Sequence, residues 1–375
     1  MNIVIAMMCC HGQPCERNRD AFIEYVYKDY QELKKQGKLK HNYQFIFYTG
    51  RTKEENEKVQ ISNKIPKELS YGRLHDENGE LLTVSDVLDN PEKITSKDLF
   101  FLEVDTPDDI KFTYEKTISA FNSIRTYLRP EFDYLIRVNI SAFLNIRLLD
   151  KVIETADPAV VYCNAINAVI TDPNYANTLY PRGDFYIISR QYIDEILFNY
   201  YKCSKLSNRM IHPYELYYIW DNIPPMMQRE QIFGNTLDHV DDVLIGCTIK
   251  DIIGPKYFDK IKMVYYNLMI YPIKEDTDIT EYLNKHVLSV RCKTVPEGQV
   301  SGWSWNDNDY RKCDVIKFRK CYEYFSKQTY ENGLTMNHLL VDENTARPVM
   351  RVDYHNVNPA EAKKNLRSRP IIGVK

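Results

Sequence analysis

Residues 2–10, NIVIAMMCC, decide the fold, because they form a nearly continuous apolar run that polar residues follow directly. Such a run is typical of a β-strand that is buried on both faces, as in a parallel sheet. In segment 17–37 the apolar residues recur every three to four positions, which predicts an amphipathic helix ending at Gly37. Residues 43–50, YQFIFYTG, predict a second buried strand. A strand, a helix and a strand in this order form a βαβ unit.

Strand and helix patterns continue to alternate along the chain. Residues 51–98 are polar and predict a long excursion with short helices, and residues 98–104 predict a third strand. Segment 105–128 predicts a helix, with Asp105 or Thr106 as its N-cap. The later predicted elements are a strand over 134–138, a helix over 147–156, a strand over 158–170, a strand and a helix over 184–198, and a helix over 239–254.

The order of these elements predicts a mixed α/β fold with a central sheet flanked by helices. The pattern becomes less regular after residue 255. We therefore expect one α/β domain over residues 1–255 and a carboxy-terminal α+β extension over residues 256–375 that packs on it.

Composition excludes several classes of protein. The chain has 375 residues, of which 44% are hydrophobic and 27% charged, and its net charge is −3. This balance disfavours disorder and a nucleic-acid partner. No segment approaches the roughly 20 apolar residues of a membrane span, and the N-terminal run lacks the basic start of a signal peptide. The nine cysteines lack zinc-site spacing. We expect a soluble, cytoplasmic protein with reduced thiols and no integral membrane segment.

Polar residues that directly follow the predicted strands are the candidates for a site, since open α/β sheets bind ligands at the carboxyl ends of their strands. Each of them, taken alone, can equally be a polar turn or a helix cap. The chain has no G-x-G-x-x-G, no P-loop and no G-x-S-x-G, which argues against dinucleotide enzymes, NTP hydrolases and α/β-hydrolases. The candidates are Cys10, His11, Gly12 and Gln13, then Gly50 and Arg51, then Asn139 and Ser141, and finally Asp241 and Asp242 at the start of a helix.

Several segments within residues 1–255 carry a collinear pattern. They are a helix with Arg17, Arg19 and Asp20, the strand FIFYTG, the segment DDIKFTYEKTISAF with Lys116 and Thr117, the strand RVNISAFLN with Arg137, Phe143 and Asn145, then GDFYIISRQYIDEIL, and HVDDVLIG. In this order they resemble the β-1,3-glycosyltransferase and fringe-like family of GT-A glycosyltransferases. The resemblance implies a GT-A fold, a nucleotide-sugar donor, with a UDP-sugar expected, and a glycan or glycoconjugate acceptor.

The resemblance also implies an inverting mechanism, in which a carboxylate takes the proton of the attacking hydroxyl. The aspartate of the family's Asp-Val-x-x-Gly element supplies this base and matches Asp242. Asp241 beside it would raise the pKa of Asp242 by like-charge repulsion. The alternative is that either residue only caps the helix and interacts with its dipole.

The sequence departs from the family at the metal site. Family members hold Mn²⁺ or Mg²⁺ with an Asp-x-Asp triplet, whose outer positions are Asn139 and Ser141 here. The resemblance therefore implies a Mn²⁺ or Mg²⁺ cofactor, whereas the neutral pair Asn139 and Ser141 argues against one, because neutral ligands bind such cations weakly. Three alternatives remain: other carboxylates rebuild the site, basic residues replace the metal, or catalysis is lost. The carboxylates in question are Asp105, Asp108 and Asp109, and the basic residues are Arg291, Lys293, Arg311 and Lys312.

The predicted site and the candidate functions are as follows. The leading hypothesis is an inverting glycosyltransferase, and the alternative is a catalytically inactive GT-A-like protein that binds a nucleotide or a glycan. A nucleotidyltransferase is a third, weaker interpretation. The predicted catalytic residues are Asp242 and Asp241, and the predicted donor-binding residues are Cys10, His11, Gly12, Arg51, Arg137, Asn139, Ser141, Arg291 and Lys293.

Overall fold

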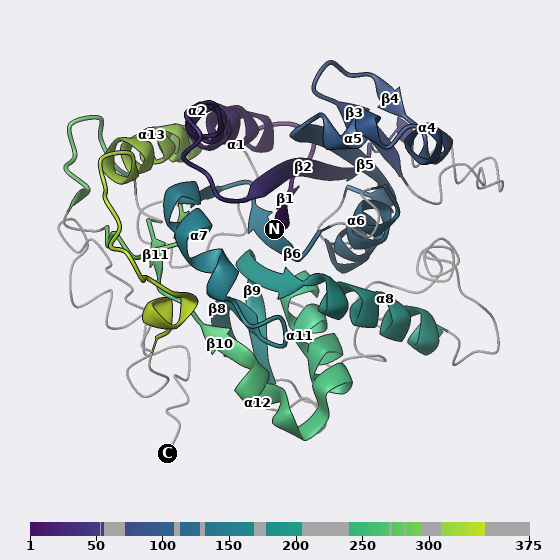
Figure 1. Ribbon diagram of the computed structural model, residues 1–375. Coiled ribbons are helices and arrows are strands. Elements are labelled where there is room, and N and C mark those ends of the chain that lie inside the picture. The colour runs from purple at the N-terminus through teal and green to yellow at the C-terminus, as the bar shows by residue number, and fades with distance from the viewer. Residues whose placement is uncertain are drawn as a thin grey trace.

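The structure is a computed structural model of the chain. It has a central β-sheet with helices on both faces (Figure 1). No helix in the part of the chain that the structure describes is long and apolar enough to cross a membrane. The described residues are 1–52, 54–55, 72–108, 113–127, 132–168, 178–204, 240–269, 272–280, 283–294 and 309–341.

Four parallel strands form the middle of the sheet. In spatial order they are β5 (Leu99–Pro107), β2 (Asn42–Arg51), β1 (Asn2–Met8) and β6 (Tyr134–Asn139). The chain first builds outward from β1 to β2 and β5, and later adds β6 on the other side of β1. The gap between β1 and β6 is therefore a topological switch point, where open α/β sheets bind ligands.

Further strands extend the sheet on both sides to nine strands among the described residues, and each is antiparallel to its inner neighbour except β10, which is parallel to β8. β5 is followed by β3 (Arg73–Asp76) and β4 (Leu81–Leu82), both paired antiparallel to their inner neighbours. On the other side, β9 (Thr178–Ser189) runs antiparallel to β6 and carries β8 (Val161–Ala168) and then β10 (Ile261–Met263). The beginning of β9 therefore lies at the same edge as the end of β6.

The residues of β1 alternate between two hydrophobic clusters, because successive side chains of a strand point to opposite faces. Both sets are almost completely removed from solvent, which confirms the prediction of a strand buried on both faces. One cluster contains Ile3, Ile5 and Met7, and the other contains Val4, Ala6 and Met8.

Helices from both ends of the chain cover one face of the sheet (Figure 1). The first helical segment comprises α1 (Cys15–Phe22), the π-helical turn η1 (Ile23–Tyr27) and α2 (Lys28–Lys35). α7 (Ile146–Val152) and α13 (Cys313–Phe325) pack into the same cluster. A helix late in the chain thus shares a core with the first one.

The opposite face is covered by α6 (Thr113–Tyr127), α8 (Arg190–Ser204) and α11 (Val240–Ile253). Two short helices, α4 (Val84–Asp89) and α5 (Glu92–Thr95), also contribute to this second core. The remaining short helical elements are η4 (Ile153–Thr155), η6 (Gly254–Lys256), α12 (Tyr257–Lys260), η8 (Asp309–Lys312) and η9 (Met336–Leu339).

A small second sheet joins the later part of the chain to the end of β6. It consists of β7 (Ala142–Leu144), β12 (Ser289–Arg291) and β11 (Tyr266–Leu268). β12 is antiparallel to β7, and the backbone N–H of Cys292 donates to the carbonyl of Ser141 at 2.8 Å. Residues around position 291 are thereby fixed beside the turn that follows β6.

The predicted mixed α/β fold with a central, flanked sheet is confirmed, as are the predicted strands at 2–10, 43–50 and 134–138 and the helix over 239–254. The division at residue 255 stays a prediction. The segment before β5 holds β3 and β4 as well as the expected short helices.

The predicted N-cap of the helix over 105–128 is wrong, because Asp105 and Thr106 belong to β5. After a register shift, β5 continues to pair with β2 as far as the pair Arg51 and Pro107. Backbone pairing in the sheet therefore prevails over the local capping signal at Asp105 and Thr106.

Candidate functional site

The carboxyl ends of β1 and β6 lie side by side at the switch point. Met8 is in register with Asn139, and the N–H of Ile140 donates to the carbonyl of Met8 at 3.3 Å. Both strands are followed by predicted site residues, so the loop after β1 and the turn after β6 meet at this edge. The geometry thus brings together two of the groups that the sequence analysis treated separately.

A buried lysine fixes the loop after β1. Lys116 of α6 is only 1% exposed, and its Nζ donates to the carbonyl of Cys9 at 3.0 Å and to Oδ1 of Asp108 at 2.7 Å. The other oxygen of Asp108 accepts from the N–H of His11 at 2.5 Å. Burial alone would lower the pKa of Lys116, but the Cys10 thiol and the Asp108 carboxylate raise it, so the side chain is a cation. This ion pair holds the loop against α6.

Glycine is needed at two positions here, Gly12 in the loop after β1 and Gly50 near the end of β2. Gly12 has a φ of +78°, in the left-handed region that favours glycine. Nε2 of His11 lies 2.8 Å from the carbonyl of Gly50 at the end of β2. A Cβ at Gly50 would lie 2.5 Å from the carbonyl oxygen of Thr106, so β2 and β5 approach each other too closely for any side chain there.

A pocket of about 260 Å³ opens next to this loop on the α1 side of the sheet. Such a volume is slightly below the ~300 Å³ at the lower end of small-molecule sites, so it suits one ring system rather than a whole nucleotide sugar. The rings of Phe47 and Phe101 stack with centroids 5.5 Å apart along its wall. Its polar lining includes His11, Cys15, Arg19, Thr49, His75 and Glu103.

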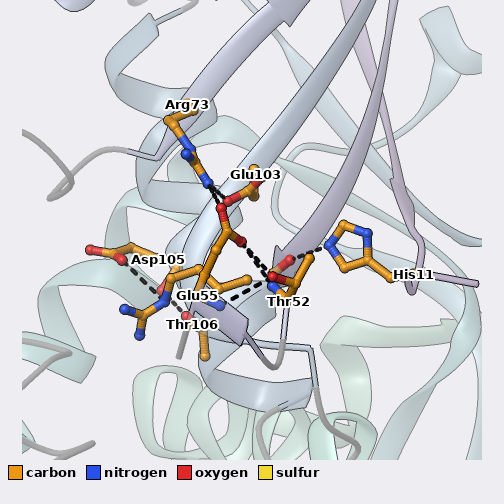
Figure 2. A network of polar contacts seen from close by, with 10 residues as sticks. His11, Thr52, Glu55, Arg73, Glu103, Asp105 and Thr106 are labelled. Atoms are coloured by element: carbon orange, nitrogen blue, oxygen red, sulfur yellow. Dashed lines mark hydrogen bonds and ion pairs between the residues drawn. The ribbon is translucent and has the colours of Figure 1, made fainter. Parts of the chain in front are cut away.

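Arg51, a predicted donor-binding residue, faces a carboxylate at this edge. Its Nε lies 3.4 Å from Oδ1 of Asp105, and both side chains are buried. Burial raises the pKa of Asp105 to about 8, although Arg51 acts in the opposite direction. Close by, Arg73 contacts both Glu55, at 2.7 Å, and Glu103 (Figure 2). Each of these two arginines thus faces at least one carboxylate: Arg51 faces Asp105, and Arg73 faces Glu55 and Glu103.

Asn139 and Ser141 close a turn between β6 and β7. Oδ1 of Asn139 accepts from the N–H of Ser141 at 3.1 Å and from its hydroxyl at 2.9 Å. Both residues are buried. The side-chain oxygen that would have to ligate a cation is thus already engaged in shaping the backbone, in agreement with the alternative of a polar turn.

Two arginines flank this turn. The pairing of β12 with β7, and the bond from Cys292 to Ser141, place Arg291 beside it. The Nη1 atom of Arg291 is buried and has no hydrogen-bond partner among the described residues. Arg137 of β6 is fully buried, with Nη2 3.3 Å from the sulfur of Met8. The predicted donor-binding residues Arg137, Asn139, Ser141 and Arg291 therefore share one region.

Positive charges accumulate around Arg291. Burial lowers the pKa of Arg291 to about 10; the carboxylate of Asp184 opposes this shift, and several arginines add to it. Burial likewise lowers the pKa of Lys293 to about 7, with further contributions from Arg291 and Arg311. We call these five side chains the cationic cluster: Arg137, Arg182, Arg291, Lys293 and Arg311.

A completely buried carboxylate anchors the later part of the cluster. Asp314 of α13 accepts from Nε of Arg311 at 2.8 Å, from the N–H of Thr294 at 2.7 Å and from Nδ2 of Asn18 at 3.0 Å. These bonds join α13, the segment after β12 and α1. Lys293 precedes Thr294 directly, so its backbone is fixed by the same anchor.

A second buried carboxylate, Asp184, lies in the middle of β9, next to Phe185, which pairs with Val138 of β6. It is 5% exposed, and neither of its oxygens has a hydrogen-bond partner in the described ranges. Nε of Arg182 is 3.6 Å from Oδ1 of Asp184. Because β9 runs antiparallel to β6, this carboxylate is near the turn at Asn139.

The donor set at this turn does not fit Mn²⁺ or Mg²⁺. Hard cations need several anionic oxygen ligands, whereas the turn supplies a neutral amide oxygen that already accepts two hydrogen bonds. The surrounding side chains are mainly cations. Within the described ranges, no group of three or more His, Cys, Asp or Glu residues could hold a metal ion.

The predicted catalytic residues Asp241 and Asp242 lie at the start of α11, as expected. Their side chains are outside the part that the structure describes, so their roles stay predictions. Further along this helix, the hydroxyl of Thr248 lies 3.1 Å from that of Tyr114 in the first turn of α6. The backbone of Asp242 is therefore about 9 Å from that of Thr248 along the axis of α11, since an α-helix rises about 1.5 Å per residue.

The sequence predicted no site role for Arg182 and Asp184, considered Asp108 only as a carboxylate that could rebuild a metal site, and included Lys116 only in the motif that carries the resemblance. Lys116 had a recognisable signal, since it lies within the apolar stripe of a helix, where a lysine needs a partner. Arg182 and Asp184 are charged residues within β9, directly before its apolar stretch from Phe185 to Ile188. Asp109, one of the carboxylates considered for a rebuilt metal site, falls outside the described residues.

No protein-family model matches the sequence, and no curated protein sequence matches it. The galactosyltransferase LgtC, solved with donor and acceptor sugar analogs, has 12% identity and a TM-score of 0.36 over 88% of this chain and 98% of that one. Apo mouse xyloside xylosyltransferase 1 has 9% identity and a TM-score of 0.31 over 78% of this chain and 97% of that one. Because both TM-scores are below 0.5, neither similarity assigns an activity to this chain.

Proposed function

We propose that this chain is an inverting glycosyltransferase, which transfers a sugar from a nucleotide-sugar donor to a hydroxyl of a glycan or glycoconjugate. A UDP-sugar is the first donor to test. The observation that carries the proposal is the meeting of separate segments at the switch point between β1 and β6. The loop after β1, the turn at Asn139 and the residues after β12 all contribute polar groups there.

The two parts of the site suit the two parts of such a donor. The pocket beside Cys9 and His11 has room for a base or one sugar ring, with aromatic and polar walls. The cationic cluster suits a diphosphate, because guanidinium groups bind phosphate oxygens with two parallel hydrogen bonds. Lys293 lies within the electrostatic influence of Cys15, which lines the pocket, so the two parts are neighbours.

The proposed chemistry is a single displacement. The acceptor oxygen forms a bond to the anomeric carbon while the bond from that carbon to the phosphate oxygen breaks, which inverts the configuration. Asp242 accepts the proton of the acceptor hydroxyl. The departing nucleoside diphosphate keeps the electron pair, and Arg291 and Lys293 stabilise its charge.

The test is a transfer and donor-hydrolysis assay over a panel of nucleotide sugars. We expect turnover of at least one donor, and a loss of about 10²- to 10⁴-fold in kcat for Asp242→Asn with donor affinity retained. Asp241→Asn is the matched control, for which we expect a smaller loss. Full turnover by Asp242→Asn would remove this residue from the role of base.

A second candidate is a protein that binds a nucleotide or a glycan without catalysis. The turn at Asn139 and Ser141 favours it, because two neutral residues replace the acidic ones of the resembling family. Tight binding of UDP together with no turnover of any donor in the panel would support this candidate over the transferase.

A further inference from the structure

We propose that Cys10 and Cys15 form a redox-active pair, which a hydroperoxide entering the pocket beside the loop after β1 oxidises to a disulfide. The oxidation of the pair follows from the positions of the two thiols and does not depend on the proposed function. Its effect on donor binding rests on the proposed function, because Cys10 belongs to the predicted donor site.

The loop after β1 places the two thiols next to each other. Cys10 follows β1 and Cys15 is the first residue of α1, and both cysteines are free. The backbone N–H of Glu16 donates to the carbonyl of Gly12 at 3.2 Å, so the chain between the two cysteines turns back tightly. A side-chain hydrogen bond joins the two thiols, and both residues line the pocket.

The surroundings favour a thiolate at Cys15. The hydrogen bond between the thiols lowers the pKa of Cys15 and raises that of Cys10, so Cys15 ionises more readily. Cys15 also lies at the N-terminus of α1, where the helix dipole stabilises negative charge. Nζ of Lys116 lies 3.8 Å from the sulfur of Cys10, which brings a positive charge next to the pair. The thiolate is the form of cysteine that reacts with a peroxide.

The pocket gives a small oxidant access to these sulfur atoms. Cys10 is half-buried, and the three residues that follow it are exposed. Cys15 is only 7% exposed, but it lines the pocket of about 260 Å³. The pocket has room for hydrogen peroxide, since the slightly smaller water molecule occupies only about 30 Å³ in the liquid.

Two other features of the chain show why this pair is distinctive. The thiol of Cys9 donates to the carbonyl of Met7 at 3.7 Å, and burial raises its pKa, so it stays protonated. The thiols of Cys292 and Cys321 are also joined by a side-chain hydrogen bond, but both residues are 0% exposed, and burial raises the pKa of Cys321. Cys292 and Cys321 therefore have the contact without the access, and they serve as an internal control.

The reaction consumes one hydroperoxide in two steps. The thiolate of Cys15 attacks a peroxide oxygen, so that a sulfur–oxygen bond forms and the oxygen–oxygen bond breaks; the leaving hydroxide takes up the proton that Cys15 released. The sulfur of Cys10 then attacks the resulting sulfenic acid, so that the sulfur–sulfur bond forms and the sulfur–oxygen bond breaks; this hydroxide leaves with the proton of Cys10. Two thiols are oxidised to one disulfide, and hydrogen peroxide is reduced to two molecules of water.

The disulfide would alter the donor site. It shortens the contact between the two sulfur atoms to about 2.0 Å, which pulls the loop after β1 toward α1. The N–H of His11, the next residue in the loop, is bonded to Asp108 at 2.5 Å, so the loop moves against this bond. We therefore expect the oxidised protein to bind the donor more weakly.

The test is mass spectrometry of the folded protein after treatment with hydrogen peroxide, alkylation and digestion. Trypsin cleaves after Arg17, so one peptide carries Cys9, Cys10 and Cys15. We expect peroxide to reduce its alkylated thiols from three to one, and a reductant to restore all three. Cys9→Ser should still form the disulfide, whereas Cys10→Ser and Cys15→Ser should form none. Cys292 and Cys321 should be oxidised at least about tenfold more slowly, because they are inaccessible.

Thermal unfolding shows whether each variant is folded, and the experiment on the unmodified protein needs no variant. Calorimetry with UDP should show at least about fivefold weaker binding after oxidation, because the preorganised loop is displaced, and recovery with a reductant. Unchanged UDP affinity in the oxidised protein would overturn the effect on the donor site.

The disulfide is measured without a donor, which separates this inference from the proposed function. A disulfide between Cys10 and Cys15 with no turnover of any nucleotide sugar would support the inference and reject the transferase, and turnover without a disulfide would do the reverse. Three alkylated thiols after peroxide treatment, a disulfide between Cys9 and Cys10, or equally fast oxidation of Cys292 and Cys321 overturns the inference.

Discussion

Nζ of Lys116 donates to Oδ1 of Asp108 at 2.7 Å, and both side chains are buried beside the loop that follows β1. The same ammonium group donates to the carbonyl of Cys9, while Asp108 accepts from the N–H of His11. One ion pair therefore holds α6, the end of β5 and the loop after β1 in one arrangement, and the proposed donor site depends on it.

We expect Lys116→Met to destabilise the fold by about 3–5 kcal/mol, because it leaves the Asp108 carboxylate buried without its cation. Denaturant unfolding measures this change. The double variant Lys116→Met with Asp108→Asn should recover part of the loss, since a neutral amide is less costly to bury than a carboxylate. Equal stability of the single variant and the unmodified protein would show that the pair does not anchor the loop.

Gly50→Ala should both destabilise the protein and weaken donor binding. The new methyl group would lie 2.5 Å from the carbonyl oxygen of Thr106, so β2 and β5 must separate, at a cost of about 1–3 kcal/mol or more. This movement displaces the carbonyl that His11 contacts. Gly37→Ala is the control: its φ of +63° predicts a stability loss of about 1–2 kcal/mol, but it lies at the end of α2, away from the site. UDP affinity should fall only in Gly50→Ala.

Donor affinity should decrease as the pH rises above about 7, the value to which burial lowers the pKa of Lys293. Below this pH Lys293 is already charged, whereas above it the free protein must take up a proton to bind the anion. The dissociation constant should then rise by up to about tenfold per pH unit until the pKa of the complex is reached. UDP-glucose is the suitable probe, because its esterified phosphates lack the second ionisation near pH 6. The slope should vanish in Lys293→Gln; a slope in that variant equal to that of the unmodified protein would assign the proton to another group.

Asn139→Asp should weaken donor binding in EDTA by about tenfold. A carboxylate oxygen can accept the same two hydrogen bonds from Ser141, so the turn is kept. The added negative charge lies beside Arg291 and Arg137 and competes with the diphosphate for them. Calorimetry with UDP measures the loss. An unchanged or increased affinity in EDTA would mean that the diphosphate does not lie at this turn.

The fold could be predicted from the sequence because its central strands are buried on both faces and therefore carry long apolar runs. The run Ile3 to Met8 is the clearest case. The length of β5 could not be predicted, because Asp105 and Thr106 have good capping chemistry locally but belong to this strand. Tertiary pairing of this kind leaves no local signal.

The sequence could indicate where part of the candidate site lies, for a comparable reason, although the roles of its residues stay predictions. Polar residues after strands, such as His11 and Asn139, are visible in the sequence because the carboxyl edge of a parallel sheet collects them. Arg291 and Lys293 were selected only for their charge, and their position beside Ser141 depends on the pairing of β12 with β7. The burial of Asp184 was not predicted because one acidic residue at the start of the predicted strand over 184–198 resembles a surface turn, whereas β9 begins earlier, at Thr178.

The central claim is that a nucleotide-sugar donor lies at the edge between β1 and β6 with its diphosphate on the cationic cluster. A crystal structure of the protein soaked with UDP and Mn²⁺ tests it most directly. We expect the diphosphate within hydrogen-bond distance of Arg291 and Lys293, with no Mn²⁺ between it and Asn139. A diphosphate bound elsewhere, or held at this edge by a metal ion and out of reach of both side chains, would contradict the account.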